Sequence, residues 1–293
     1  MGHLMAKQKK IIGAESFEAY YSNLYKNEWP VLKESLYKET KYFEFKFSKD
    51  CESYFLDGAS VCAGLCLPVI NAEKILDLCA APGGKTLVVS STAFNNGKET
   101  VLTSNERSFD RFKRLERTVQ TCVPVELQHR IKTQCSDGSV LCKKINSEFD
   151  SILLDAPCSS ERHVLQDSKY LNQWTPNRVK TMTFEQHALI SSAVRMLKTG
   201  GYLLYATCAL ATDENDGTIS KLLKKNKEVQ PVDFDTVSQI FKNNLDVSQK
   251  YFSGQVTLES IFNSAIKTQY GFHVLPHRCN GFGPLFFGVL KKI

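Results

Sequence analysis

The sequence lacks the features that would place it in a specialised class of protein. It has no apolar run approaching 18 residues, so we expect no membrane-spanning helix. It has no Cys-x-x-Cys pair, and its ten cysteines are scattered without the spacing of a zinc site. We expect neither a signal peptide nor a disulfide framework in this chain of 293 residues, and we find no internal repeat. These absences leave a globular protein with a sizeable core.

The composition is that of an ordinary globular protein. Hydrophobic residues make up 42% of the chain and charged residues 23%. The formal net charge of +6 is compatible with a nucleic-acid partner but does not establish one. Residues 1–13 predict a disordered tail, and the acidic, arginine-free stretch after them argues against a transit peptide. We therefore expect an intracellular protein that is cytoplasmic, or mitochondrial if the natural chain begins earlier.

Residues 14–53 predict an N-terminal extension that is rich in aromatic side chains. Phe17, Tyr20, Tyr21 and Leu24 have helical spacing, and Pro30 suits the start of a second helix. We expect a helical cap that packs on the main domain. Because lysines lie between the aromatics, the alternative is a surface that faces nucleic acid.

The remaining residues, 54–293, alternate between strand and helix patterns. A buried helix is expected at 54–67, and the runs 270–274 and 285–290 predict a C-terminal antiparallel hairpin. Between them, strands at 75–79, 101–104, 129–134, 150–155 and 201–206 alternate with helices at 84–93, 108–121, 177–198 and 212–226. This alternation predicts an α/β fold with a mostly parallel sheet covered on both faces. Ligands of such sheets bind at the carboxyl ends of the strands.

The chain is organised around residues 75–86, Ile-Leu-Asp-Leu-Cys-Ala-Ala-Pro-Gly-Gly-Lys-Thr. The pattern predicts a buried strand, a tight turn and the start of a helix, and its glycines let backbone N–H groups approach a ligand. An ordinary strand-to-helix turn is the alternative. The stretch resembles motif I of the Sun-type RNA (cytosine-5) methyltransferases, in which Asp-Leu-Cys-Ala-Ala-Pro-Gly-Gly-Lys-Thr cradles S-adenosyl-L-methionine.

This resemblance implies a Rossmann-like class I methyltransferase fold and S-adenosyl-L-methionine as cofactor. The cofactor-binding residues that it implies in the turn are Cys79, Ala80, Ala81, Pro82, Gly83, Gly84 and Lys85.

Acidic residues follow the second and third strands. A carboxylate after the second strand can accept two ribose hydroxyl groups, and Glu106 lies there. Residues 104–115 resemble the family's Ala-Asn-Asp-x-Ser-x-x-Arg, with Glu106 in place of the commoner Asp; a charge at a helix N-terminus is the alternative. The family places an Asp near the adenine amino group, which implies that role for Asp137, although Asp-Gly is also a common turn pair. We expect Arg111 to support the pocket.

Two cysteines and a carboxylate follow the next two strands. Asp155 is followed by Pro157 and Cys158, and the last strand leads to Cys208. Carbon 5 of cytosine is a poor nucleophile, and adding a thiolate to carbon 6 converts the ring into an enamine that can accept a methyl group. Asp-Ala-Pro-Cys together with Thr-Cys resembles the two-cysteine signature of the Sun family. The alternative is two buried structural cysteines.

The signature implies Cys208 as the nucleophile, Cys158 in product release and Asp155 at N3 of the base, within the cofactor pocket. In DNA cytosine-5 methyltransferases the Pro-Cys thiol attacks instead, so the two-cysteine arrangement favours RNA as substrate. A scaffold without turnover, or a methyltransferase of proteins or small molecules, is the alternative. Neither needs a nucleophilic cysteine.

One segment departs from the pattern of many members. Where these have glycines and an arginine after Pro-Cys, this chain reads Ser159-Ser-Glu-Arg-His163. That is closer to the mitochondrial ribosomal-RNA member of the family, as are Trp29-Pro30 and residues 282–286. Arg162 and His163 are candidates to contact RNA, or else structural residues. We expect ribosomal RNA as substrate, with transfer RNA as the alternative. The basic face, the N-terminal extension or a partner protein that delivers the RNA would place it.

Overall fold

The computed structural model describes residues 12–95 and 98–293. The predicted tail, residues 1–13, lies outside the described residues up to residue 11. Gly13 is buried, and its N–H donates to the Trp174 carbonyl at 2.9 Å. Gly13, the last residue of the predicted tail, is therefore packed against the main domain.

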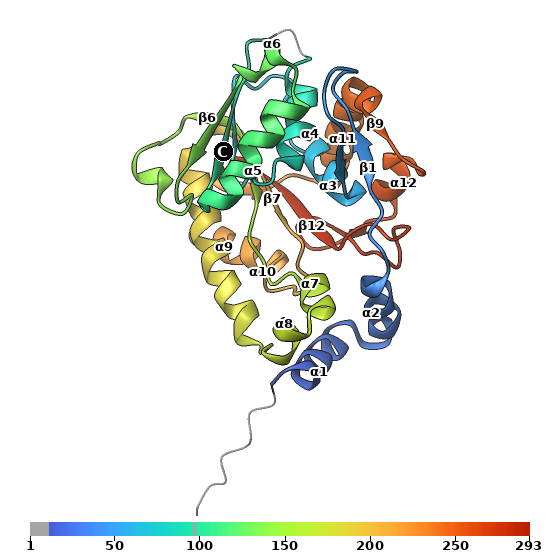
Figure 1. The fold of residues 1–293 in the computed structure, drawn as a ribbon. Helices are drawn as coiled ribbons and strands as arrows, with labels where there is room; N and C mark the ends of the chain where they lie inside the picture. The colour runs from blue at the N-terminus through green and yellow to red at the C-terminus, as the bar shows by residue number, and fades with distance from the viewer. Residues whose placement is uncertain (1–11, 96–97) are drawn as a thin grey trace, which may run out of the picture.

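A parallel sheet forms the centre of the molecule and confirms the predicted fold class (Figure 1). Its strands run in the order β5-β4-β3-β6-β7, and each neighbouring pair is parallel. The strands are β3 (Lys74–Asp77), β4 (Val101–Glu106), β5 (Ile131–Cys135), β6 (Phe149–Asp155) and β7 (Leu197–Thr207). The order in which the chain adds strands reverses at β3: β4 and β5 lie on one side of it, and β6 and β7 lie on the other. Such folds bind ligands at this switch point, between β3 and β6.

Antiparallel strands extend the sheet beyond β7. β12 (Leu285–Lys292) pairs with β7 on one side and β11 (Phe272–Val274) on the other, which confirms the predicted C-terminal hairpin. The short strands β10 (Ile266–Lys267) and β8 (Val229–Pro231) complete the sheet. They were not predicted, because two or three residues carry no recognisable period.

Helices cover both faces of the sheet. α9 (Asn177–Met196) and α10 (Asp216–Lys225) pack on one face. The other face carries α3 (Gly58–Leu65), α4 (Gly84–Ala93), α5 (Phe109–Cys122), α11 (Phe234–Ser248) and α12 (Leu258–Asn263). In the described part of the chain, no helix has both the length and the apolar character needed to cross a bilayer.

Two predicted helices begin or end elsewhere. α10 begins at Asp216 rather than at residue 212, because residues 211–215 form tight turns with bonds such as Glu214 N–H to the Ala211 carbonyl. The predicted helix 54–67 is wrong over its first residues: Tyr54–Leu56 is a strand, β2. Asp57 then caps α3 by accepting the Ala59 N–H at 2.7 Å.

β2 belongs to a small second sheet. It pairs with β1 (Phe43–Phe45), which also pairs with β9 (Phe252–Ser253). The alternation of aromatic and charged residues over 39–47 thus gives a strand of only three residues, β1. Through this sheet the N-terminal extension pairs with segments of the main domain.

The N-terminal extension is the helical cap that its spacing predicts. Its helices are α1 (Ala14–Tyr25) and α2 (Trp29–Tyr37), and Phe17, Tyr21 and Trp29 are almost wholly buried. The rings of Phe17 and Tyr21 contact Trp174, and Trp29 packs on both of them. The helices α1, α2, α7 (Glu161–Gln166) and α8 (Ser168–Asn172) lie together at the lower end of the molecule (Figure 1). These aromatics therefore form a core and do not face solvent.

Candidate active site

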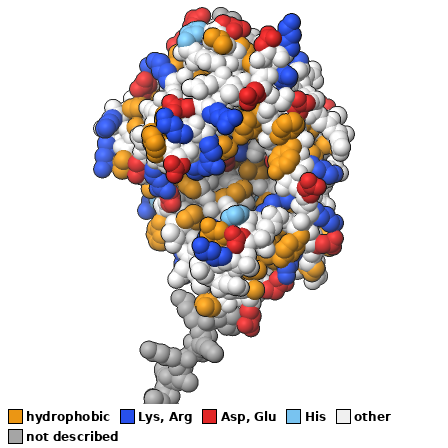
Figure 2. All heavy atoms as spheres, in the orientation of Figure 1, with side chains coloured by type: hydrophobic (Ala, Val, Ile, Leu, Met, Phe, Trp, Pro, Cys, Tyr) orange, Lys and Arg blue, Asp and Glu red, His pale blue; other side chains and the backbone are white. Residues whose placement is uncertain are grey.

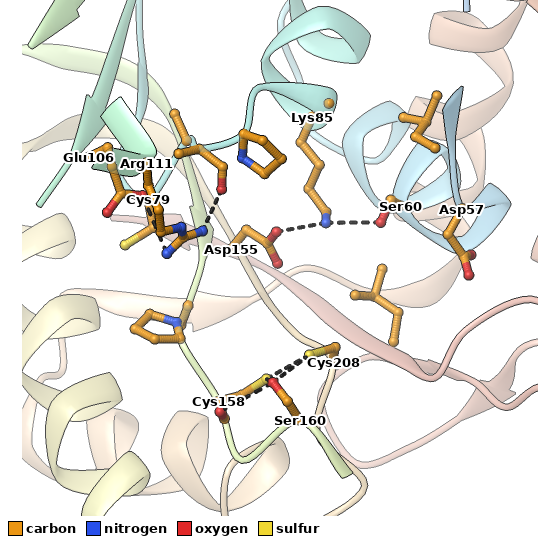
Figure 3. Close-up of a pocket in the computed structure, with 18 of the residues that line it drawn as sticks. Asp57, Ser60, Cys79, Lys85, Glu106, Arg111, Asp155, Cys158, Ser160 and Cys208 are labelled. Carbon is orange, nitrogen blue, oxygen red and sulfur yellow. Dashed lines mark hydrogen bonds and ion pairs between the residues drawn. The ribbon is translucent and has the colours of Figure 1, made fainter. Parts of the chain in front are cut away.

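A cavity of about 760 Å³ opens at the carboxyl ends of the central strands. Figure 2 shows the hollow in this face of the molecule, and Figure 3 shows its interior. Every residue that the sequence singled out for the cofactor, the chemistry or RNA lines this cavity, except Gly83. The cavity also has lining residues that the sequence did not single out, and these include Tyr54, Asp57, Ser60, Asp77 and Asn105.

The glycine turn is held tightly between β3 and α4. Gly83 has a φ of +117°, and a Cβ there would lie 2.8 Å from Thr118 Cγ2 on α5. A Cβ on Gly84 would lie 3.0 Å from the Tyr54 ring. Gly83 is therefore needed for backbone conformation and packing, whereas Gly84 keeps the cavity side of the turn free of a side chain.

Glu106 ends β4, and only one of its two carboxylate oxygens accepts a hydrogen bond. Its side chain is 4% exposed, and Oε1 accepts the Ser108 N–H at 2.9 Å. Oε2 is buried without a hydrogen-bond partner, although Arg111 Nη1 lies 3.4 Å away. Arg111 also donates to the Ala81 carbonyl at 2.5 Å, so it links Glu106 to the glycine turn. The free oxygen can accept a ligand's hydroxyl group.

Asp77, the acidic residue that ends β3, was not singled out from the sequence. Its Oδ2 accepts the Thr86 hydroxyl at 2.7 Å, and its Oδ1 is buried without a partner. Burial raises the pKa of Asp77 to about 7. The signal was present as a carboxylate inside an apolar strand directly before the glycine turn, where burial is costly without a purpose.

Asp137 lies at an exposed part of the cavity wall. Its Oδ1 accepts the Ser139 hydroxyl at 2.8 Å and the Ser139 N–H at 2.9 Å, and these bonds lower its pKa. Oδ2 has no such bond in the described structure and is available to a ligand.

Lys85 and Asp155 form an ion pair across the floor of the cavity. Lys85 Nζ lies 2.7 Å from Asp155 Oδ2 and donates to Ser60 Oγ at 3.1 Å (Figure 3). Burial lowers the pKa of Lys85, but the Asp155 carboxylate outweighs it, and the net shift is upward. The lysine is therefore charged.

The two cysteines meet beside this pair. Their sulfur atoms lie 2.7 Å apart, from the loop after β6 and the end of β7, and point toward each other in Figure 3. Ser160 Oγ lies 3.4 Å from Cys208 Sγ. The hydrogen bond from Cys158 lowers the pKa of Cys208, whereas the same bond and burial raise the pKa of Cys158. Cys208 is thus the thiol that ionises first, and a thiolate is the nucleophilic form.

Arg162 and His163 lie at the cavity wall in different surroundings. Arg162 donates to the Thr40 hydroxyl at 3.0 Å and to the Gly283 carbonyl at 2.7 Å, so it holds the extension and the C-terminal loop together. His163 is exposed, with its ring 5.1 Å from that of Tyr170. Contact of either residue with RNA stays a prediction.

Comparison with known proteins finds a family and relatives that are named as RNA methyltransferases. The family model described as "16S rRNA methyltransferase RsmB/F" matches residues 65–277. A mouse protein, "tRNA (cytosine(34)-C(5))-methyltransferase, mitochondrial", is 30% identical over 242 residues, which cover 82% of this chain and 63% of the relative. The "5-cytosine rRNA methyltransferase NSUN4" of Xenopus laevis is 28% identical over 251 residues, with coverages of 83% and 57%. The chain thus spans about three fifths of the length of these relatives.

A solved structure supports the fold alone. The methyltransferase homologue protein of Pyrococcus horikoshii superposes with a TM-score of 0.64 at 17% identity, covering 94% of each chain.

Proposed function

The chain belongs to the family described as the 16S rRNA methyltransferases RsmB/F, and on this premise we propose that it methylates carbon 5 of a cytosine in RNA with S-adenosyl-L-methionine. The observation that carries the proposal is the pair of thiols beside Asp155, in the same cavity as the glycine turn. A binding scaffold has no need of a thiol whose pKa is lowered in a cavity.

The cavity fits the proposed cofactor. Glu106 Oε2 and Asp77 Oδ1 are buried acceptors without partners, and the carboxylates complement a cationic ligand that carries ribose hydroxyl groups. Gly84 leaves the turn open on the cavity side, and Asp137 offers a further acceptor. Glu106 would hold the ribose, and the turn from Cys79 to Lys85 would surround the remainder. When bound, S-adenosyl-L-methionine supplies the methyl group.

The cysteines and Asp155 account for the chemistry of the base. The Cys208 thiolate adds to carbon 6, so that a sulfur–carbon bond forms as the double bond between carbons 5 and 6 opens. Carbon 5 then becomes nucleophilic. We assign the Asp155 carboxyl group to N3, where electron density grows during the attack, and the ion pair with Lys85 would hold that group in place. After methylation, a base takes the proton from carbon 5, the double bond between carbons 5 and 6 re-forms, and Cys208 leaves as a thiolate. We assign the proton removal to the thiolate form of Cys158, which its raised pKa makes the stronger base of the two.

Ribosomal RNA is the first substrate candidate because the matched family is named for it. Transfer RNA is the second, because the mouse relative is named as a transfer-RNA enzyme. Phe17, Tyr21 and Trp29 of the extension are buried in the cap, which leaves Tyr37 and Tyr42 exposed. Placement of the RNA by a protein partner is a further part of the proposal.

A methylation assay on total RNA tests the function. RNA from host cells that lack the gene is incubated with the protein and methyl-labelled cofactor, separated by size, and digested to nucleosides. We expect label in 5-methylcytidine from the ribosomal fraction, and none with Cys208→Ser. Label in the transfer-RNA fraction alone would select the second candidate. Label on protein, or on another position of the base, would refute the proposal.

A further inference from the structure

Glu161 is a wholly buried carboxylate that joins three separate segments. Its Oε1 accepts the hydroxyls of Tyr21, from α1, and Ser159, from the Cys158 loop. Its Oε2 accepts the N–H of Leu210, two residues beyond Cys208, at 3.0 Å. One carboxyl group thereby links both cysteine loops to the N-terminal extension.

Leu210 is held on its other side by the same helix. Tyr25, one turn beyond Tyr21 on α1, donates its hydroxyl to the Leu210 carbonyl at 2.8 Å. The residue that follows Cys208 by two positions is thus bound at its N–H by Glu161 and at its carbonyl by α1 itself. The backbone after Cys208 has little freedom to shift along the strand.

A second buried carboxylate braces the Cys158 loop from the other side. Glu214 Oε2 accepts the Ser159 N–H at 3.0 Å and the Gln186 amide at 2.8 Å. Ser159 is therefore fixed at its N–H by Glu214 and at its hydroxyl by Glu161. Because Ser159 is adjacent to Cys158, this fixes one thiol, while the bond to Leu210 fixes the other.

We propose that Glu161 is a positioning residue that sets the separation of the Cys158 and Cys208 thiols, and that Tyr21 is the part of the N-terminal extension that holds Glu161 in place. The extension then belongs to the active centre, although none of its α1 residues lines the cavity. The catalytic consequence rests on the proposed function. The geometric role does not, because the distance between two thiols can be tested without RNA.

A chemical probe of the thiol pair tests the geometric role. Diamide removes two hydrogens from a pair of close thiols and leaves a disulfide, and peptide mass spectrometry identifies the Cys158–Cys208 product. We expect Tyr21→Phe and Glu161→Gln to slow this reaction at least five-fold. Tyr20→Phe is the matched control, because it removes a hydroxyl from the same helix for which the described structure shows no hydrogen bond. We expect it to react at the unmodified protein's rate.

Steady-state methylation tests the catalytic consequence. Displacements near 1 Å can cost about a hundred-fold in rate, so we expect Tyr21→Phe and Glu161→Gln to lower kcat ten-fold or more. The KM for RNA should change less than two-fold, because neither residue lies in the cavity. Merely structural hydrogen bonds would lower Tm and leave kcat and the diamide rate of the folded protein unchanged.

The outcomes separate the two proposals. Unchanged diamide rates in both folded variants would overturn the positioning role, whatever the methylation assay gives. A slowed diamide reaction in a protein that methylates no RNA would support the positioning role and count against the proposed function alone. If Glu161→Gln does not fold, Tyr21→Phe decides the question by itself.

Discussion

Lys85 Nζ lies 2.7 Å from Asp155 Oδ2, so the helix that follows the glycine turn is joined by charge to the strand that leads to Cys158. The Lys85 side chain is 10% exposed and that of Asp155 33%. This contact couples the cofactor side of the cavity to its catalytic side.

We expect Lys85→Met to lower the free energy of unfolding by about 2 kcal/mol, because it leaves the Asp155 carboxylate without its cation. This is below the cost of breaking a fully buried pair, since Asp155 is one-third exposed. Urea denaturation measures the change. The double variant with Asp155→Asn should recover part of the loss, and additive losses would show that the two side chains are not coupled.

Replacing Cys208 and replacing Cys158 are predicted to stop the reaction at different steps, before and after the covalent adduct forms. Cys208→Ala should abolish both turnover and the covalent adduct with RNA. Cys158→Ala should still allow attack and methylation by Cys208, so that the product stays attached and survives denaturing gel electrophoresis. An adduct in Cys208→Ala but not in Cys158→Ala would reverse the roles, and loss of two merely structural thiols would produce no adduct in either variant.

Glu106 is predicted to bind the cofactor through its unpaired oxygen. Glu106→Gln should weaken binding of S-adenosylmethionine, measured by calorimetry, by about ten-fold or more, because hydrogen bonds to charged groups contribute about 1.5–3 kcal/mol. Glu116→Gln on α5, the helix that follows β4, is the control, because Glu116 pairs with Lys113 outside the cavity. Equal affinities of the two variants would contradict the ribose role.

The raised pKa of Asp77 predicts that the free energy of unfolding falls as the pH rises. Its pKa is about 7 in the folded protein and 3.8 as an ordinary aspartate, so the folded state keeps a proton that the unfolded chain releases. The stabilisation is therefore full below about pH 4 and is lost as the pH rises through 7. Between pH 5 and pH 8 this amounts to about 3 kcal/mol. Asp77→Asn should remove that part of the slope in urea unfolding at the two pH values, and an unchanged slope would contradict the assignment.

The alternation of strands and helices and the position of the chemistry could be predicted from local patterns. Four apolar runs each carry a local signal, because a buried strand and the polar residue that ends it are adjacent in sequence. These runs end at Asp77, Glu106, Asp155 and Cys208. The α/β alternation then brings those ends to one edge. No knowledge of distant contacts is required for that step.

The supports of the site could not be predicted in the same way. Tyr21 reaches Glu161 across 140 positions of sequence, and Gly283 donates to Asp57 across 226. Such hydrogen bonds leave no periodic trace in either segment. The short strands β8 to β10 show no alternation over two or three residues. The helix α11 was missed although its signal is local, because Asp233 caps it and Val237, Phe241 and Leu245 recur at helical spacing.

The pairing of β12 with β7 has a consequence for how the chain folds during its synthesis. β7 carries Cys208 at its end, and residues 286 and 287 pair with residues 207 and 206. Until residues 285–292 have left the ribosome, that side of β7 presents unpaired backbone groups along an apolar strand, which is a template for aggregation. A nascent chain therefore depends on a chaperone, or on rapid completion, to protect this edge. Truncation before residue 285 is expected to give insoluble protein even though every residue of the active site is present up to Cys208.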